Sequence, residues 1–169
     1  MATKKKKAAP RKRAAAAPSQ KDAIAVLKAD HETVRGLLSQ LEKAAGRGGD
    51  RAMKLVAQVE AEVKVHTTVE EEIFYPAFRD AARSKDDKKL YYEANQEHHV
   101  VDLVMPEMDA PGTNEEFAAK AKVLKELIEH HADEEEKEMF PKARKLFTRD
   151  ELRDLGERLE ERKKELQGR

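Results

Sequence analysis

Two identical steps of histidine and glutamate constrain the fold of this chain more than any other feature. Four positions separate His66 from Glu70 and His131 from Glu135, and a proline follows each histidine after ten residues. Positions i and i+4 share one face of an α-helix, so each step directs an imidazole and a carboxylate to the same point. Two such helices facing each other would enclose a site of mixed nitrogen and oxygen ligands.

The two steps belong to a longer internal repeat. Aligning His31 with His98 also matches Val34 with Val101, on a segment that precedes each His-x-x-x-Glu step. The repeated unit is therefore a helix with one histidine followed by a helix with a histidine and a glutamate. Two copies of this unit predict four helices packed around one centre.

The apolar residues recur with helical periodicity, and no run alternates with the period of a strand, which predicts an all-α chain. Three regions are expected: a disordered basic tail over residues 1–20, a helical bundle over 21–147 and a C-terminal helix within 148–169. The first predicted helix covers about Lys21–Ala45 and begins at a Ser19…Asp22 capping pattern, and the second covers about Asp50–Arg83, with a kink or the beginning of its end at Pro76. The third covers about Asp86–Met108. The fourth begins at the capping box Thr113…Glu116, and the last, Leu152–Leu166, follows the cap Thr148…Glu151.

Composition excludes several classes of site. Charged residues make up 40% of the chain and hydrophobic residues 39%, which is typical of helices with narrow apolar stripes. The chain has no cysteine, so disulfides, thiolate catalysis, Cys-ligated zinc and iron–sulfur clusters are all excluded. No apolar run approaches the ~20 residues of a membrane span, and no signal peptide is recognisable. We therefore expect a cytoplasmic protein.

The net charge of zero hides an uneven distribution. Residues 1–20 hold seven of the 34 basic side chains and none of the 34 acidic ones, so the tail carries +7 and the remainder −7. Such a tail could contact nucleic acid weakly through phosphates, or it could be a solubilising extension with no partner. We favour the second interpretation.

The histidines are concentrated in the repeated unit, and their positions predict a metal site. For a single histidine, a core or surface role would be the better interpretation. Four at repeat-related positions, two of them with a carboxylate at i+4, favour metal binding, because a cation offsets the cost of burying carboxylates. The predicted metal ligands are His31, His66, Glu70, His98, His131 and Glu135.

Neighbouring residues offer alternatives. His98 is preferred over His99 because it matches His31 in the repeat, and the proline spacing selects the pair of His131 and Glu135 over the shifted pair of His130 and Glu134. Acidic runs are most often solvated helix faces. We assign that role to Glu71, Glu72, Glu134 and Glu136.

Ligand chemistry narrows the choice of metal. Imidazole and carboxylate without thiolate suit iron, manganese or zinc. Four histidines and two glutamates exceed one tetrahedral site, and two ions bridged by Glu70 and Glu135 would each keep open positions for an exogenous ligand. We expect two iron ions, with manganese or zinc less favoured, and dioxygen or peroxide as the natural ligands.

The order of His31, the two His-x-x-x-Glu steps, His98, Tyr75-Pro76 and Phe140-Pro141 resembles the hemerythrin-like (HHE cation-binding) domains over about residues 22–147. The resemblance implies an up-down-up-down four-helix bundle with a non-haem di-iron centre. Members of this family bind oxygen, sense oxygen or iron, store iron, or react with peroxide and nitric oxide. The resemblance therefore implies a di-iron protein that binds or reacts with dioxygen or peroxide. The alternative is a protein that stores iron or senses iron or oxygen. Catalase-like turnover, and so the assignment as an enzyme, stays open.

The sequence departs from the oxygen-carrying hemerythrins, which have two histidines four residues apart on their third helix. Here Ala94 and Asp102 occupy the positions four residues either side of His98, and Glu135 comes at a shorter spacing than the aspartate of the carriers. A further oxygen ligand could fill the gap, which weakens the case for reversible oxygen carriage. The candidates for this ligand, which the sequence does not rank, are Tyr91, Tyr92, Glu97 and Asp102.

Overall fold

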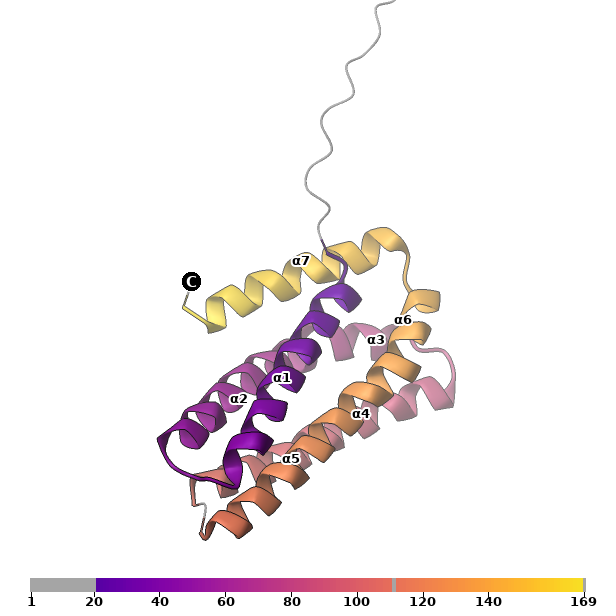
Figure 1. Cartoon of the computed structure of the whole chain (residues 1–169). Coiled ribbons are helices and arrows are strands. Elements are labelled where there is room, and N and C mark those ends of the chain that lie inside the picture. Colours follow the sequence, from indigo (N-terminus) through magenta and orange to yellow (C-terminus); the bar gives the residue numbers. More distant parts are fainter. Residues whose placement is uncertain (1–20, 111, 169) are drawn as a thin grey trace, which may run out of the picture.

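The computed structural model describes residues 21–110 and 112–168, and no strand occurs in these two ranges (Figure 1). The all-α prediction is therefore confirmed for the described residues, and the predicted tail over residues 1–20 lies outside them. In chain order the elements are α1 (Ala23–Ala45), α2 (Asp50–Val69), η1 (Glu70–Phe74), α3 (Tyr75–Ala81), α4 (Lys85–Val104), η2 (Met105–Asp109), α5 (Asn114–Glu134), η3 (Glu135–Met139), α6 (Phe140–Leu146) and α7 (Arg149–Leu166).

Side-chain caps fix where the helices begin. Thr113 and Thr148 each form the predicted capping box, in which the threonine hydroxyl accepts from the third residue of the helix and the glutamate there accepts from the threonine N–H. The first helix differs from the prediction. Asp22 is itself the N-cap and accepts from the N–H of Ala25 at 2.8 Å, whereas Ser19 lies outside the described residues.

The second and fourth helical arms continue through their prolines, and the second ends at Ala81, shortly after Pro76. A π-helical turn precedes each proline, η1 before Pro76 and η3 before Pro141. In these turns the N–H of Tyr75 bonds the carbonyl of Glu70, five residues earlier. Each proline then falls in the first turn of the next α-helix, where its missing N–H costs little.

The third arm also differs slightly from the prediction. Its α-helix ends at Val104, and a 3₁₀ turn over Met105–Asp109 replaces the last predicted turn. Met105, the residue before Pro106, keeps α-helical dihedral angles. Pro106 itself has no N–H to continue the α-helical hydrogen bonds, which accounts for the change at this point.

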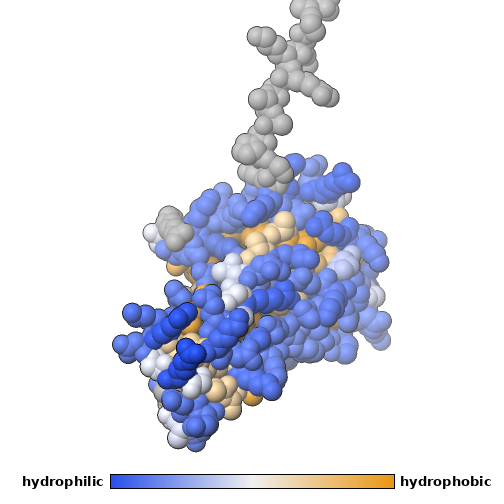
Figure 2. Space-filling view, viewed as in Figure 1, coloured by the Kyte–Doolittle hydropathy of each residue, from blue (hydrophilic) through white to orange (hydrophobic). Residues whose placement is uncertain are grey.

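The four arms run alternately up and down beside one another, and α7 crosses one end of them (Figure 1). Two apolar cores fill the space between the arms. One is formed by the halves of the helices distant from α7, including Leu41, Val59 and Leu124, and the other lies under α7 and includes Phe74 and Phe78. Figure 2 shows an otherwise hydrophilic face on which apolar side chains are visible only in strips between the elements.

Helix α7 packs on the bundle. Leu152, Leu155 and Leu159 are buried against the core, and Leu166 at the end of the helix is 38% exposed. Gly156 permits this approach, since a Cβ atom there would lie 2.4 Å from the carbonyl oxygen of Lys21. Within the described residues no helix has the length and apolar character needed to cross a membrane.

Candidate metal centre

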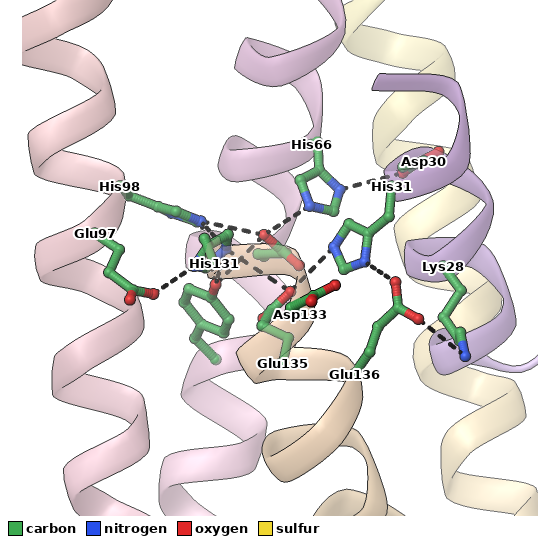
Figure 3. Close-up of polar contacts among 12 residues, drawn as sticks. Lys28, Asp30, His31, His66, Glu97, His98, His131, Asp133, Glu135 and Glu136 are labelled. Carbon is green, nitrogen blue, oxygen red and sulfur yellow. Dashed lines mark hydrogen bonds and ion pairs between the residues drawn. The ribbon is translucent and has the colours of Figure 1, made fainter. Parts of the chain in front are cut away.

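The fold brings the six predicted ligands together in the layer between the two apolar cores. They come from all four arms and are all buried: His31 from α1, His66 from α2, Glu70 from η1, His98 from α4, His131 from α5 and Glu135 from η3. Figure 3 shows the imidazoles of His31, His66, His98 and His131 converging on the space between the helices.

The six side chains form two groups that share one carboxylate. His31, His66, Glu70 and Glu135 make the first group, in which His31 Nε2 lies 3.2 Å from Glu135 Oε2 and His66 Nε2 lies 3.2 Å from Glu70 Oε2. We call His31 and His66, with these carboxylate oxygens, the first half-site.

The second group consists of Glu70, His98 and His131, and we call it the second half-site. His98 Nε2 lies 3.3 Å from Glu70 Oε2 and 3.0 Å from His131 Nε2. Glu135 Oε2 lies 3.8 Å from His131 Nε2, so both glutamates reach toward both halves. Two cations could therefore be held side by side with Glu70 between them.

A tyrosine hydroxyl adjoins the second half-site, and it is not among the four oxygen donors considered from the sequence. Tyr75 Oη lies 3.2 Å from His98 Nε2, 3.4 Å from His131 Nε2 and 3.4 Å from Glu70 Oε2. Its side chain is fully buried. The matching position in the repeat is Phe140, whose ring stacks on His31 at a centroid distance of 5.7 Å.

The four oxygen donors suggested by the sequence lie elsewhere. Tyr92 and Asp102 are exposed, and Tyr91 packs edge-on against the ring of Tyr75. Glu97 accepts a hydrogen bond from Nδ1 of His131 at 2.7 Å, on the side of the ring away from the shared carboxylates. The alternatives His99 and His130 are both exposed.

Each of the four imidazoles has a carboxylate at its outer nitrogen, Nδ1. Their distances are 2.9 Å from Glu136 to His31, 3.5 Å from Asp30 to His66, 2.8 Å from Glu71 to His98 and 2.7 Å from Glu97 to His131. An acceptor at Nδ1 holds the proton there and leaves Nε2 free to bind a metal.

Two of these outer carboxylates correct the sequence analysis. Glu71 and Glu136 were assigned to solvated faces, but each accepts from a buried imidazole. The other two acids have surface partners: Glu72 bonds Arg162 of α7, and Glu134 pairs with His130. A displacement of one residue separates Glu71 from Glu72, and a displacement of two residues separates Glu136 from Glu134.

Because the inner side chains of the site are buried close together, the protonation of each depends on the charges of the others. Burial, together with the charge of Glu135, raises the pKa of Glu70 well above its usual range, so two bare carboxylates are not tolerated side by side. Burial also lowers the pKa of His66 to about 4, so its imidazole is neutral at pH 7. Burial and the nearby glutamates raise the pKa of Tyr75 well above its ordinary value.

Several inner atoms have no hydrogen-bond partner within the described chain, although they are buried. Facing the common space they are His31 Nε2, His66 Nε2, Glu70 Oε1 and both carboxylate oxygens of Glu135. On the outer side, His66 Nδ1 and Asp30 Oδ2 also lack a hydrogen bond, because the 3.5 Å between them makes an electrostatic contact only. Unsatisfied buried polar atoms are costly and rare. Imidazoles and carboxylates aimed at a common space fit a divalent or trivalent cation of the iron, manganese or zinc type.

A small cavity lies beside the imidazoles. It has a volume of about 20 Å³ and is lined by all four site histidines together with apolar side chains such as Val34 and Val63. About 10–15 Å³ is needed to hold one water molecule. The cavity therefore has room for a water molecule or for a species with two heavy atoms.

Fold and site together define an all-helical protein with a buried cluster of histidines and glutamates suited to cations. The family model of the hemerythrin HHE cation-binding domain matches residues 22–143, and the chain therefore belongs to this family. The predicted family resemblance is confirmed. The match ends before α7, which begins at Arg149.

Mycobacterial proteins are among those to which the chain is similar. The chain is 30% identical over 152 residues to protein Rv2633c of Mycobacterium tuberculosis and to protein Mb2666c of Mycobacterium bovis, covering 87% of this chain and 88% of each relative. A crystal structure of a hemerythrin HHE cation-binding domain-containing protein from Mycobacterium kansasii, an Rv2633c homolog, superposes with a TM-score of 0.74 at 27% identity. It covers 87% of this chain and 88% of that one.

Proposed function

We propose that this chain is a non-haem di-iron protein whose centre binds or reacts with dioxygen or peroxide. The observation that carries the proposal is the set of unpartnered buried atoms on Glu70, Glu135, His31 and His66, which need a cation inside the bundle. The proposed ligands are His31, His66, Glu70, His98, His131 and Glu135.

The sharing of Glu70 between both groups supports two ions rather than one. Glu70 and Glu135 would each bring a carboxylate toward both ions, and each half-site would supply two imidazoles. Iron held in this way supplies redox chemistry toward small oxygen species. Tyr75 Oη, within 3.4 Å of three inner groups, is the proposed additional oxygen ligand of the second half-site.

The surroundings restrict what can react. The cavity of about 20 Å³ excludes organic substrates and admits dioxygen, peroxide or nitric oxide. Carboxylate and phenol oxygens favour the oxidised metal over the reduced one, which supports reaction with oxygen or peroxide more than reversible oxygen carriage. The outer carboxylates keep each Nδ1 protonated, so all four Nε2 atoms stay available.

Iron content and peroxide consumption test this proposal together. Protein loaded with ferrous iron should bind two ions per chain and consume hydrogen peroxide, whereas His98→Ala and His131→Ala should lose both properties. The adjacent exposed histidines supply matched controls, so His99→Ala and His130→Ala should behave as wild type. A protein that binds one zinc ion or no iron after anaerobic loading would contradict the proposal.

A second candidate is an iron-storage protein or an iron sensor. The burial of Glu70 beside Glu135 favours it, because the two carboxylates repel each other once the metal leaves. A sensor should show a large metal-dependent change in thermal stability without peroxide turnover. Rapid turnover with little change in stability would instead support the reactive centre.

The predicted weak contact with nucleic acid rests on the charge of residues 1–20, which lie outside the described residues. DNA binding that weakens steeply with salt, and that disappears when residues 1–20 are deleted, would support it. Binding that is absent or independent of salt would leave the solubilising extension as the better interpretation.

A further inference from the structure

Helix α7 lies beyond the residues matched by the family model, yet it contacts the elements that carry the site. It packs on α1, on α2 and on the π-helical turn η1. Leu155 and Leu159 bury its apolar stripe, and Gly156 lets it approach the start of α1. An element outside the family domain is therefore well placed to influence the metal centre.

One chain of contacts joins α7 to the first half-site. Lys163 of α7 donates to Oδ1 of Asp30 on α1. The other oxygen of Asp30 lies 3.5 Å from Nδ1 of His66, and Nε2 of His66 lies 3.2 Å from Glu70. Figure 3 shows Asp30 directed at the outer edge of the His66 ring. Asp30 is only 9% exposed, so water does little to solvate its charge.

The outer partners of the other histidines are held differently. Glu136, beside His31, is paired with Lys28 and Arg35, both on α1. Glu71 and Glu97, beside the second half-site, pair with no lysine or arginine of residues 21–110 and 112–168. Among the described residues, Lys163 is the sole lysine or arginine paired with Asp30.

We propose that Lys163 is a positioning residue that, through Asp30, fixes the ring of His66 with its Nδ1 proton outward and its Nε2 toward the metal. The inference rests on the proposed metal centre and adds a regulatory role for α7. Lys163 holds one oxygen of the buried Asp30 carboxylate, and the other oxygen is thereby directed at Nδ1 of His66. Without Lys163 the Asp30 carboxylate is no longer held beside the ring, and the proton of neutral His66 redistributes between its two nitrogens.

The consequence is confined to one half of the centre. Losing an outer partner of a metal-bound histidine typically costs about 10–100-fold in metal affinity. Lys163 acts through Asp30, so an effect near about 10-fold is expected. It should fall on the first half-site and leave His98 and His131 unaffected.

Three variants of the full-length chain test the inference. Lys163→Met removes the charge and keeps an apolar stem, and Lys163→Arg restores the charge. Arg162→Met is the matched control, because Arg162 is the neighbouring residue of α7 but pairs with Glu72, which contacts no site histidine. Hydrogen exchange over 152–159 in each variant reports whether α7 remains docked.

Two readouts are measured. Stepwise competition for ferrous iron with a chelator should show one of two ions held about 10-fold less tightly in Lys163→Met, with Lys163→Arg and Arg162→Met as wild type. In the metal-free protein, nitrogen NMR of the histidine rings should show His66 protonated at Nδ1 in wild type and mixed tautomers in Lys163→Met.

The outcomes separate this inference from the proposed function. If the wild-type protein binds two irons and Lys163→Met equals it in both readouts, the positioning role of Lys163 is overturned and the proposed function stands. A defect of equal size in Arg162→Met also overturns it, because general docking of α7 would then be responsible. If wild type binds no iron, the proposed function fails, and the tautomer of His66 in Lys163→Met still decides whether Lys163 orients the ring.

Discussion

The two half-sites come from equivalent units of the repeat, yet their surroundings differ. In the first half-site the outer carboxylates Asp30 and Glu136 are held by cations, namely Lys163 in one case and Lys28 with Arg35 in the other. In the second half-site Glu71 and Glu97 are partly exposed, and neither pairs with a lysine or arginine among the described residues.

The inner surroundings differ as well. Tyr75 brings a hydroxyl to the second half-site, whereas Phe140 presents only a ring face to His31 in the first. Charge-assisted hydrogen bonds are stronger than neutral ones, and a fixed partner orients a ligand better than a mobile one. The comparison indicates that the outer partners of the first half-site are held firmly by cations, whereas the second half-site has looser outer partners and an additional hydroxyl from Tyr75. A repeat in sequence therefore does not make the two positions equivalent.

The largest effect is expected at Glu70, because its loss should weaken metal binding in both half-sites. Glu70 belongs to both groups of ligands, whereas Glu135 belongs to the first. Glu70→Ala should therefore lower iron affinity at both positions by more than about 100-fold, the upper range for losing an outer partner alone. Elemental analysis of iron per chain measures this. If Glu70→Ala still retains one tightly bound ion, Glu70 is not the shared ligand.

The next prediction compares one outer carboxylate of each half-site, Glu136 beside His31 and Glu97 beside His131. Glu136→Gln should weaken the first half-site by about 10–100-fold, because it removes a charge held by Lys28 and Arg35. Glu97→Gln should weaken the second by less than about 10-fold, since water can replace a partly exposed acceptor. Stepwise iron titration of the two variants measures both values. Equal losses would show that the cations around the first half-site have no consequence for metal binding.

A third prediction concerns the hydroxyl that distinguishes Tyr75 in the second half-site from Phe140 in the first. Tyr75→Phe removes the hydroxyl from the second half-site, and leaving its buried partners unsatisfied costs about 1–3 kcal/mol, or about 5–150-fold in affinity. The visible absorption of the iron-loaded protein should also change in Tyr75→Phe. Phe140→Tyr, its counterpart in the repeat, should place a new hydroxyl near His31. An unchanged spectrum in Tyr75→Phe would exclude Tyr75 as a ligand.

Much of this arrangement could be predicted from the sequence because helical periodicity is a strong signal. The caps at Thr113 and Thr148 and the buried faces of the helices follow from local rules that the chain obeys. The convergence of His66 with Glu70 and of His131 with Glu135 also follows, because i and i+4 share a face.

The role of Tyr75 could not be predicted from the same rules. Tyr75 lies five positions after Glu70, and on a regular α-helix these two positions point in different directions. The π-helical turn between them lengthens one turn of the helix by a residue, which brings Tyr75 Oη to 3.4 Å from Glu70 Oε2. The Tyr-Pro pair was visible, but its meaning depends on a turn that sequence periodicity does not reveal.

The outer partners were missed for a different reason. Asp30 reaches His66, and Glu136 reaches His31, across helices that are distant in the sequence. An acidic residue next to a ligand position is solvated or buried depending on a rotation of its helix, which packing decides. Glu71 and Glu72 are adjacent in one run, yet the first bonds His98 and the second bonds Arg162.

The smallest expected effect on the site tests whether α7 supports the first half-site alone. Gly156→Ala places a Cβ 2.4 Å from the carbonyl oxygen of Lys21, and this overpacking should lower the free energy of unfolding by about 1–3 kcal/mol. Gly36→Ala is the control, because it lies inside α1 with open space around the new atom and should stabilise by about 0.5–1 kcal/mol. Urea unfolding of the metal-free proteins gives both values.

Displacing α7 also moves Lys163 relative to Asp30, whereas His98 and His131 lie on helices for which no close packing against α7 is seen. Iron held in the first half-site should therefore weaken by less than about 10-fold in Gly156→Ala, since α7 shifts without losing the lysine. The second half-site should match wild type in the same titration. Weakening of both positions together would mean that the bundle transmits the strain as a whole, and the contrast between the half-sites would then not extend to α7.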